Sequence, residues 1–319
     1  MSLIDKLYSF IILFAVIIGI SIGQVSFIQT NADSLIVPLL ITMLYITFLQ
    51  IPIEKNKKAF KNIKFTYTAV MINFLWTPVL AGLLGFLFLY DNPALYIGFI
   101  MLMVTPCTDW YLIFTSIAKG NVAISAAILP LNLLIQIILL PFYLLIFGGT
   151  TGTIELTFLV ESILFVLIIP FILALLTKFL LKNKNELKEK LFSNISLLPL
   201  IFLSLAITAM FASQGQLLLD NLGLMWKMTI PILLFFVINL IISQKIGHLM
   251  NFSYRDRASL SLTTLARNSP IALAIAMTAF PDQPLIALTL VIGPLLELPL
   301  LAIITQLLLL NKIGSTYKF

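Results

Sequence analysis

Two five-residue segments decide how this chain folds: Thr105-Pro106-Cys107-Thr108-Asp109 and Ala266-Arg267-Asn268-Ser269-Pro270. Each interrupts a long apolar run, residues 94–118 and 258–280 respectively. The segments are 161 positions apart (266 − 105), so they fall at matching places in the two halves of the chain. Interrupted hydrophobic helices at corresponding positions of two halves are typical of the binding site of a secondary transporter. We therefore expect the proline of each segment to break a membrane helix at a shared site.

The bulk composition predicts an integral membrane protein. Of 319 residues, 61% are hydrophobic and 10% are charged, and the mean hydropathy is +1.11. Soluble domains are about half apolar and about a quarter charged. The apolar runs are long and continuous and do not alternate with polar residues, which favours helices over a β-barrel. The predicted fold class is all-α, as one transmembrane domain over residues 1–319 with the lipid bilayer as its surroundings.

The sequence divides into ten apolar stretches, each long enough to cross a bilayer. They cover residues 7–25, 34–53, 66–89, 94–118, 121–148, 157–181, 195–213, 222–245, 258–280 and 284–309. Five spans per half is an odd number, so the second half enters the membrane from the opposite face. We therefore predict two inverted repeats, at about 1–153 and 154–319, with the broken helices four and nine crossing.

Lysine and arginine set the orientation. Loops on one side of the membrane carry almost all the basic residues, including Lys55, Lys57, Lys58, Lys61, Lys119, Lys182, Lys184, Lys188, Lys190, Arg255 and Arg257. The positive-inside rule then puts both termini in the cytoplasm of a multi-pass protein of the plasma membrane. This distribution accounts for the net charge of +6 without a nucleic-acid partner.

Several classes of function are disfavoured. With one cysteine, Cys107, and one histidine, His248, the chain offers neither an internal disulfide nor a structural metal site, and we expect no cofactor. It has no glycine loop for nucleotide phosphates, which argues against an ATP-driven pump. An enzyme would need a nucleophile and a base, and the spans hold no histidine. A passive channel would not need matched broken helices.

Cys107 follows Pro106 about 13 residues into its span, roughly 20 Å at the helical rise and so near mid-membrane. Proline removes a backbone donor and opens the helix, and non-helical backbone survives at that depth only inside protein or beside a cavity. The thiol is therefore either a soft ligand for a thiophilic solute, such as trivalent arsenic or antimony, or a small buried apolar group.

Asp109 and Arg267 are ionisable groups at mid-membrane depth, where each needs a partner. If the two broken helices cross, these side chains come within reach of each other. The pair would then either lock the crossing or act as a switch, in which a proton or substrate at Asp109 releases Arg267 to bind an anion.

Short polar residues surround the breaks. Thr108, Asn268 and Ser269 either bind a solute or cap the half-helices. Asn132 and Gln136 lie four residues apart, on one face of the fifth span. They either line the same cavity or hydrogen-bond between helices.

Glu297 lies in the last span between two prolines, in Gly293-Pro294-Leu295-Leu296-Glu297-Leu298-Pro299. Burial of a carboxyl in apolar surroundings favours its protonated form, which suits a proton carrier. Alternatively, the protonated carboxyl bonds a carbonyl that a proline has freed.

The Pro-Cys-Thr segment at 106–108, the Gly-Asn pair at 120–121 and the Gly-Pro-Leu-x-Glu-x-Pro segment at 293–299 resemble the arsenite efflux permeases. These permeases belong to the bile acid/sodium symporter superfamily, whose ten helices form core and panel domains. The resemblance covers the whole chain in topology. It implies proton-coupled export of arsenite, and of antimonite, with Cys107 and Glu297 as the matching functional residues.

Two departures from that pattern bear on mechanism. Asp109 stands where the arsenite permeases usually have a small residue. Arg267 and its neighbours lead into an apolar run, residues 271–274, where the relatives carry acidic and amide groups, the sodium ligands of the bile acid symporters. The sequence therefore disfavours sodium coupling at the familiar positions. The alternative to arsenite is a small organic anion whose carboxylate binds Arg267.

Overall fold

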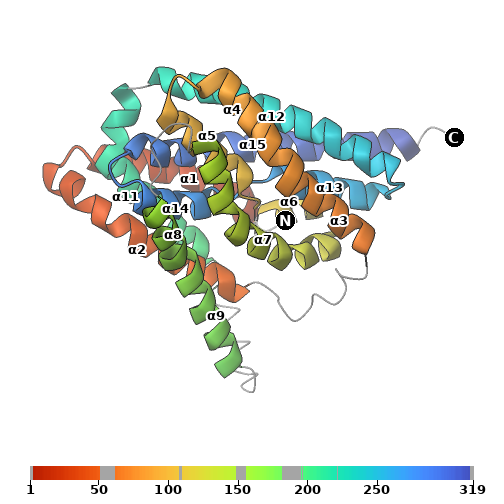
Figure 1. The fold of residues 1–319 in the computed structure, drawn as a ribbon, viewed down its shortest axis with the longest axis horizontal. Coiled ribbons are helices and arrows are strands. Elements are labelled where there is room, and N and C mark those ends of the chain that lie inside the picture. Colours follow the sequence, from red (N-terminus) through yellow and green to blue (C-terminus); the bar gives the residue numbers. More distant parts are fainter. Residues whose placement is uncertain are drawn as a thin grey trace.

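The structure is a computed structural model that describes residues 3–50, 62–107, 110–148, 156–181, 195, 197–220 and 222–316. The described residues are helical, and their elements follow the predicted runs (Figure 1). In chain order they are α1 (Leu3–Ile22), α2 (Ser26–Gln50), α3 (Ile63–Met71), η2 (Ile72–Trp76), α4 (Thr77–Leu89), α5 (Pro93–Val104), α6 (Trp110–Ile117), α7 (Val122–Gly148), α8 (Leu156–Ile163), η4 (Leu164–Ile168), α9 (Ile169–Leu180), α11 (Leu198–Asp220), α12 (Leu222–Leu249), α13 (Tyr254–Leu265), α14 (Ser269–Ala279) and α15 (Pro284–Thr316). The all-α membrane class predicted from composition is confirmed.

Among the described residues, seven helical stretches are long and apolar enough to cross a membrane. They are Ser26–Gln50, Ile63–Leu89, Val122–Gly148, Thr157–Leu180, Leu198–Gln216, Trp226–Leu249 and Pro284–Leu310. Three shorter apolar helices accompany them, at Leu13–Ile22, Pro93–Val104 and Ser269–Ala279. The last two are short because they are halves of the broken runs. The protein is therefore a multi-pass membrane protein.

Hydropathy located the helices but not all of their ends. α2 begins at Ser26, eight residues before the predicted start at 34 (34 − 26), and its first turns carry exposed polar residues such as Gln29 and Thr30. α12 continues to Leu249, beyond the predicted end at 245. A helix satisfies its own backbone in water as well as in lipid, so it continues past the apolar run that marks the bilayer.

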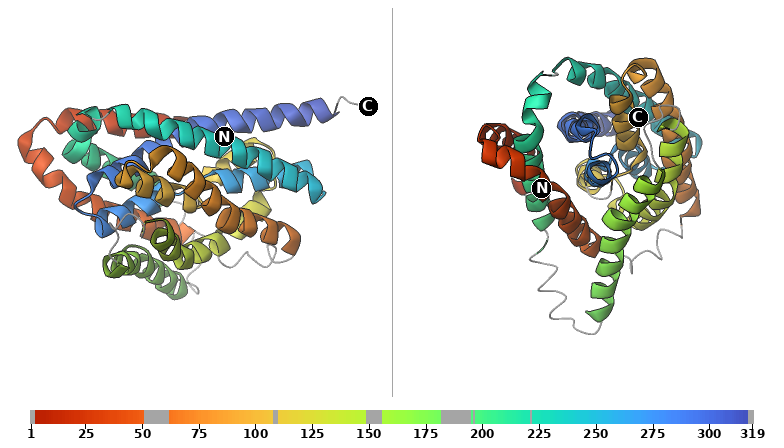
Figure 2. Two further views of the ribbon diagram at one scale, coloured as in Figure 1. Left: turned by 45° about the horizontal axis from the view of Figure 1, so that its top comes forward. Right: turned by 60° about the vertical axis from the view of Figure 1, so that its left-hand side comes forward.

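The helices pack as two groups. In the first group, α11 packs against α1 and α2, and α2 packs against α9; α4, α5, α7, α12, α13 and α15 form the second group. α14 belongs with α15 and α5 but also packs against α2 and α8, so it lies where the two groups meet. In the right-hand view of Figure 2, α1, α2 and α11 lie along one side of the second group.

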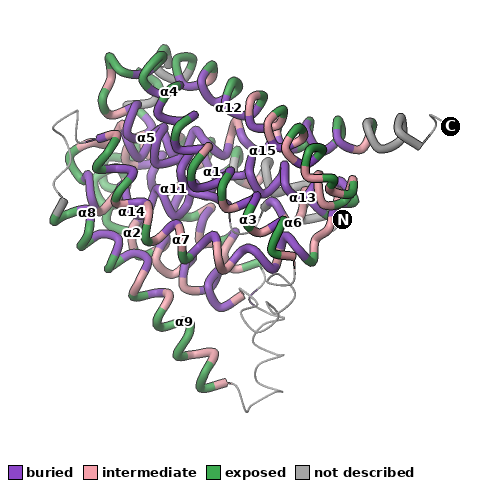
Figure 3. Tube along the Cα trace, turned by 45° about the vertical axis from the view of Figure 1, so that its right-hand side comes forward, coloured by how far each residue is buried: buried purple, intermediate pink, exposed green. Residues whose placement is uncertain are grey.

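The buried residues gather along α5, α13 and α14, whereas α9 exposes most of its length (Figure 3). Phe179 and Leu180, near the end of α9, are more than two-thirds exposed in the protein alone, as expected of a face that meets lipid. α5 and α15 approach closely because Gly98 and Gly293 have no Cβ: an added Cβ at Gly98 would lie 2.7 Å from the Cβ of Thr289. This contact fixes α15, and with it Glu297, beside the end of α5.

The basic loops that set the predicted orientation, around residues 55–61 and 182–190, lie outside the described residues. The cytoplasmic placement of the termini therefore stays a prediction.

Candidate functional site at the crossing of the two breaks

The structure brings the two broken segments together. Pro106 and Arg267 form an isolated antiparallel bridge. The backbone N–H of Cys107 donates to the carbonyl of Ala266 at 3.0 Å, and that of Asn268 donates to the carbonyl of Thr105 at 2.7 Å. Each break thus satisfies backbone groups of the other, which lets non-helical backbone persist inside the protein.

The local sequence explains where the half-helices end and begin. Thr105 and Ala266, which follow α5 and α13, both have extended backbone. Extended conformation before Pro106 is expected because proline disfavours a helical residue at the preceding position. Asn268 caps α14, since its side-chain oxygen accepts from the N–H of Ile271 at 3.2 Å, and Pro270 lies in the first turn of that helix, where it needs no donor.

Asn268 and Ser269, two of the predicted solute ligands, form hydrogen bonds within the protein. Asn268 caps α14, and the hydroxyl of Ser269 donates to the carbonyl of Leu290 in α15. Thr108 and Asp109 lie outside the described residues, so the predicted pair between Asp109 and Arg267 stays a prediction.

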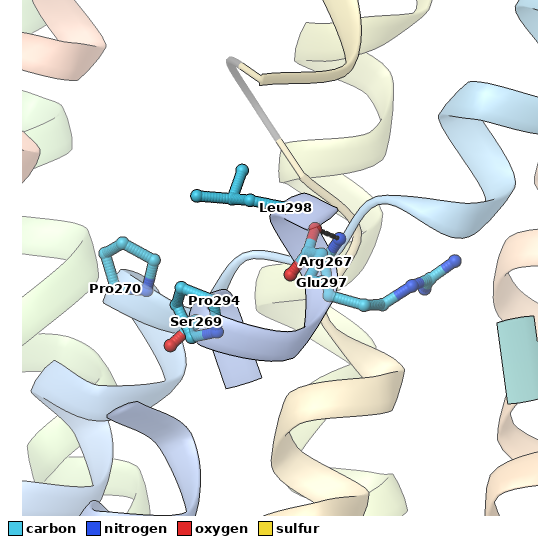
Figure 4. Close-up of a pocket in the computed structure, with 6 residues that line it drawn as sticks. All are labelled: Arg267, Ser269, Pro270, Pro294, Glu297 and Leu298. Atoms are coloured by element: carbon cyan, nitrogen blue, oxygen red, sulfur yellow. Dashed lines mark hydrogen bonds between the residues drawn. The ribbon is translucent and has the colours of Figure 1, made fainter. Parts of the chain in front are cut away.

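Glu297, on α15, hydrogen-bonds to the backbone of the second break. One carboxyl oxygen accepts a hydrogen bond of 2.7 Å from the backbone N–H of Arg267, and the side chain is 5% exposed. Figure 4 shows the carboxyl turned toward that nitrogen, while the guanidinium extends the other way. The prolines at 294 and 299 lie inside α15 on either side of this glutamate. Glu297 thus contacts the backbone of the break directly.

A small pocket of about 10 Å³ lies against the carboxyl, lined by Arg267, Ser269, Pro270, Pro294, Glu297 and Leu298. That volume holds about one water molecule. Glu297 therefore has room for a single water beside it.

The guanidinium of Arg267 is directed at backbone oxygens. Its Nε donates to the carbonyl of Leu265 at 3.1 Å, one terminal nitrogen donates to Met103 at 2.9 Å, and the other donates to Thr264. The side chain is 2% exposed. These carbonyls belong to the last turns of α5 and α13, whose partial negative charge stabilises a cation there.

Sequence reasoning missed Asn73, which lies in η2 and completes this arrangement. Its side-chain oxygen is 3.4 Å from a terminal nitrogen of Arg267, and its amide donates to the carbonyl of Thr263 at 3.4 Å. Polar side chains inside an apolar span are costly and usually functional, so an asparagine in the run 66–89 was the available signal. π-Helical turns such as η2 are frequent at functional sites.

Asn132 and Gln136, on α7, are buried and have no hydrogen-bond partner for any of their four side-chain polar atoms among the described residues. Burying an unsatisfied amide costs about 1–3 kcal/mol, so such a group is retained for a reason. Both roles left open by the sequence, a place in the wall of a cavity and a bond between helices, stay predictions for this pair.

Cys107 lies at the bridge itself. Its thiol is in a buried residue, 2% exposed, while its backbone N–H holds the opposite break. The thiol, the carboxyl of Glu297 and the guanidinium of Arg267 therefore come from three segments that meet at one crossing.

Known proteins resemble this chain over its length. The model of the sodium bile acid symporter family matches residues 37–221, more than half of the chain. The arsenical-resistance protein Acr3 of Corynebacterium glutamicum is 25% identical over an alignment that covers 94% of this chain and 87% of that protein. An uncharacterized transporter of Synechocystis, slr0944, is 21% identical over 96% of this chain and 88% of its own length. The predicted resemblance is confirmed: this chain belongs to the sodium bile acid symporter family.

Proposed function

We propose that this protein is a secondary transporter that exports arsenite in exchange for protons, with its transport site at the crossing of the two breaks. The observation that carries the proposal is the buried carboxyl of Glu297, bonded at 2.7 Å to the backbone of one break, beside the segment that holds Cys107. The arsenical-resistance relative supports the choice of substrate. Membership in a family of symporters favours transport over catalysis.

The proposed topology is that of ten spans in two inverted repeats, at about 1–153 and 154–319, in the plasma membrane with both termini in the cytoplasm. It is supported by the matched positions of the breaks and by the charge of the loops. Alternating access would then move the group that contains α1, α2, α9 and α11 against the other group. This movement would displace α14, which contacts α2 and α8 and begins at the crossing.

Each candidate residue has a proposed role in transport. The thiol of Cys107 offers one transient bond to trivalent arsenic, which prefers soft sulfur ligands. Arsenite at neutral pH is an uncharged trihydroxy acid, so the amides of Asn132 and Gln136 suit its hydroxyl groups as donors and acceptors. Glu297 carries the proton, and Asp109 is proposed as a second proton-coupling group.

The alternative, a small organic anion bound by Arg267, fits the geometry less well. The guanidinium already donates to the carbonyls of Met103, Thr264 and Leu265, and a carboxylate would have to displace these bonds. The carbonyls would then be left buried without donors, at a cost of several kcal/mol each in a membrane.

Growth of an arsenite-sensitive bacterium tests the proposal. The unmodified protein should restore growth on arsenite, and Cys107→Ser and Cys107→Ala should abolish protection. Both variants keep the backbone bond to Ala266, so their levels in the membrane should match the parent. Ser116→Ala, on an exposed position of α6, is the control and should protect fully. Failure of the unmodified protein to protect would refute the choice of substrate.

A further inference from the structure

The crossing gathers the carboxyl-terminal ends of two half-helices at one point. α5 ends at Val104 and α13 ends at Leu265. The last four carbonyls of a helix have no intrahelical donor, and they carry the negative end of the helix dipole. Val104 and Leu265 are buried, so the carbonyls at these ends depend mainly on donors from the protein. Two such ends side by side create a strong demand for positive charge.

Arg267 meets this demand with a planar group that has five donors. Its described hydrogen bonds reach four oxygens: the carbonyls of Met103, Thr264 and Leu265 and the side-chain oxygen of Asn73. The guanidinium carbon also lies 5.3 Å from the centre of the Phe235 ring, whose face attracts a cation. The four oxygens come from three separate segments, α5, α13 and η2.

We infer that these four oxygens form a cation site that the guanidinium of Arg267 permanently occupies, and that without this side chain the site binds a free monovalent cation. Carbonyl and amide oxygens are ligands for hard cations, and rings of carbonyls replace the hydration shell of alkali ions in membrane proteins. The ligand class is therefore an alkali ion or free guanidinium. The inference goes beyond the proposed function because it holds whatever solute the protein transports.

A tethered cation has a consequence for coupling. A free ion can enter and leave such a site during each transport cycle, but a side chain cannot leave with the solute. Sodium is thereby excluded from the place where the two half-helices most favour it. The guanidinium of Arg267 neutralises the two helix ends throughout the transport cycle. The coupling ion must therefore bind at another group of the protein.

The test uses purified protein in detergent and contains no transported solute, so it is independent of the arsenite proposal. The midpoint of thermal unfolding is measured for the parent and for Arg267→Ala in choline, sodium or potassium chloride at one ionic strength, and with added guanidinium. The parent should unfold at the same temperature in every salt. The variant should be least stable in choline, and its midpoint should rise with the logarithm of the sodium, potassium or guanidinium concentration.

Further variants serve as controls for the charge of the side chain and for folding. Arg267→Lys retains a tethered charge and should show no rise with sodium, whereas Arg255→Ala removes an exposed arginine in the first turn of α13, the half-helix before the break, and should behave as the parent. If Arg267→Ala does not fold in choline, folding in sodium, potassium or guanidinium supports the inference. If it folds in none of them, Arg267→Met is measured in the same four salts: a midpoint that rises with sodium, potassium or guanidinium supports the inference, and a midpoint that is the same in all four would overturn it. An Arg267→Ala midpoint that is the same in all four salts would also overturn it.

Discussion

Two substitutions of Glu297 separate its role as a hydrogen-bond acceptor from its proposed role as a proton carrier. The carboxyl accepts the 2.7 Å bond from the backbone N–H of Arg267, and it is proposed to carry the proton. Glu297→Gln keeps an oxygen that can accept this bond but cannot exchange a proton. Glu297→Ala removes both the acceptor and the proton carrier.

The structure sets the expected size of each effect. Leaving the buried N–H of Arg267 without an acceptor costs about 1–3 kcal/mol. The pocket beside the carboxyl already holds about 10 Å³, and the alanine would enlarge it enough to admit water to this N–H. We therefore expect the alanine variant to lose about 1 kcal/mol of unfolding free energy, at the low end of that range. Glutamine should lose less than the alanine variant.

The assay pairs unfolding by SDS in mixed micelles with uptake of arsenite into everted membrane vesicles driven by a pH gradient. Both variants should lose proton-driven uptake, while only alanine is measurably destabilised. Glu161→Gln is the matched control, since it makes the same chemical change at an exposed position of α8 and should alter neither quantity. Proton-driven uptake by Glu297→Gln at the parental rate would refute the proton-carrier role. Equal destabilisation of both variants would refute the hydrogen-bond argument.

Two other predictions follow from packing and from unsatisfied polar groups. Asn132→Leu and Gln136→Leu should each stabilise the protein, by up to about 1–3 kcal/mol in the SDS titration, because they remove buried amides that have no hydrogen-bond partner among the described residues. Each should also lower transport, and destabilisation with normal transport would contradict their proposed role in the site. Gly98→Ala should destabilise by about 1–3 kcal/mol, because the new Cβ would lie 2.7 Å from a threonine Cβ, whereas Gly293→Ala meets only the flexible end of a leucine and should cost less. Unchanged stability of Gly98→Ala would show that α5 and α15 are not in close contact there.

The sequence predicted the helical runs and the two breaks that meet in the structure, because both depend on patterns that the membrane enforces. Apolar runs of bilayer length must be helical, and the spacing of 161 marks where they are interrupted. The helix ends at Ser26 and Leu249 were not predictable from hydropathy, because they lie beyond the apolar runs.

The partners of the site residues could not be predicted from the sequence. The bonds of the Arg267 guanidinium to the carbonyls of Met103 and Leu265 were not predicted, since a long side chain beside two helix ends has several acceptors within reach, and its predicted pair with Asp109 stays a prediction. Glu297 was predicted to carry a proton or to bond a carbonyl, and both stay predictions; the bond it accepts from the backbone N–H of Arg267 was not predicted. Which backbone groups a break leaves exposed depends on how the two breaks cross, and residue spacing does not determine that.

The most direct test of the central claim is arsenite uptake into everted vesicles that contain the unmodified protein, measured with an imposed pH gradient in the presence and absence of sodium. The account predicts uptake that follows the pH gradient, stops when a protonophore collapses it and is the same in sodium and in choline. Uptake that requires sodium, or no arsenite uptake under any gradient, would contradict it.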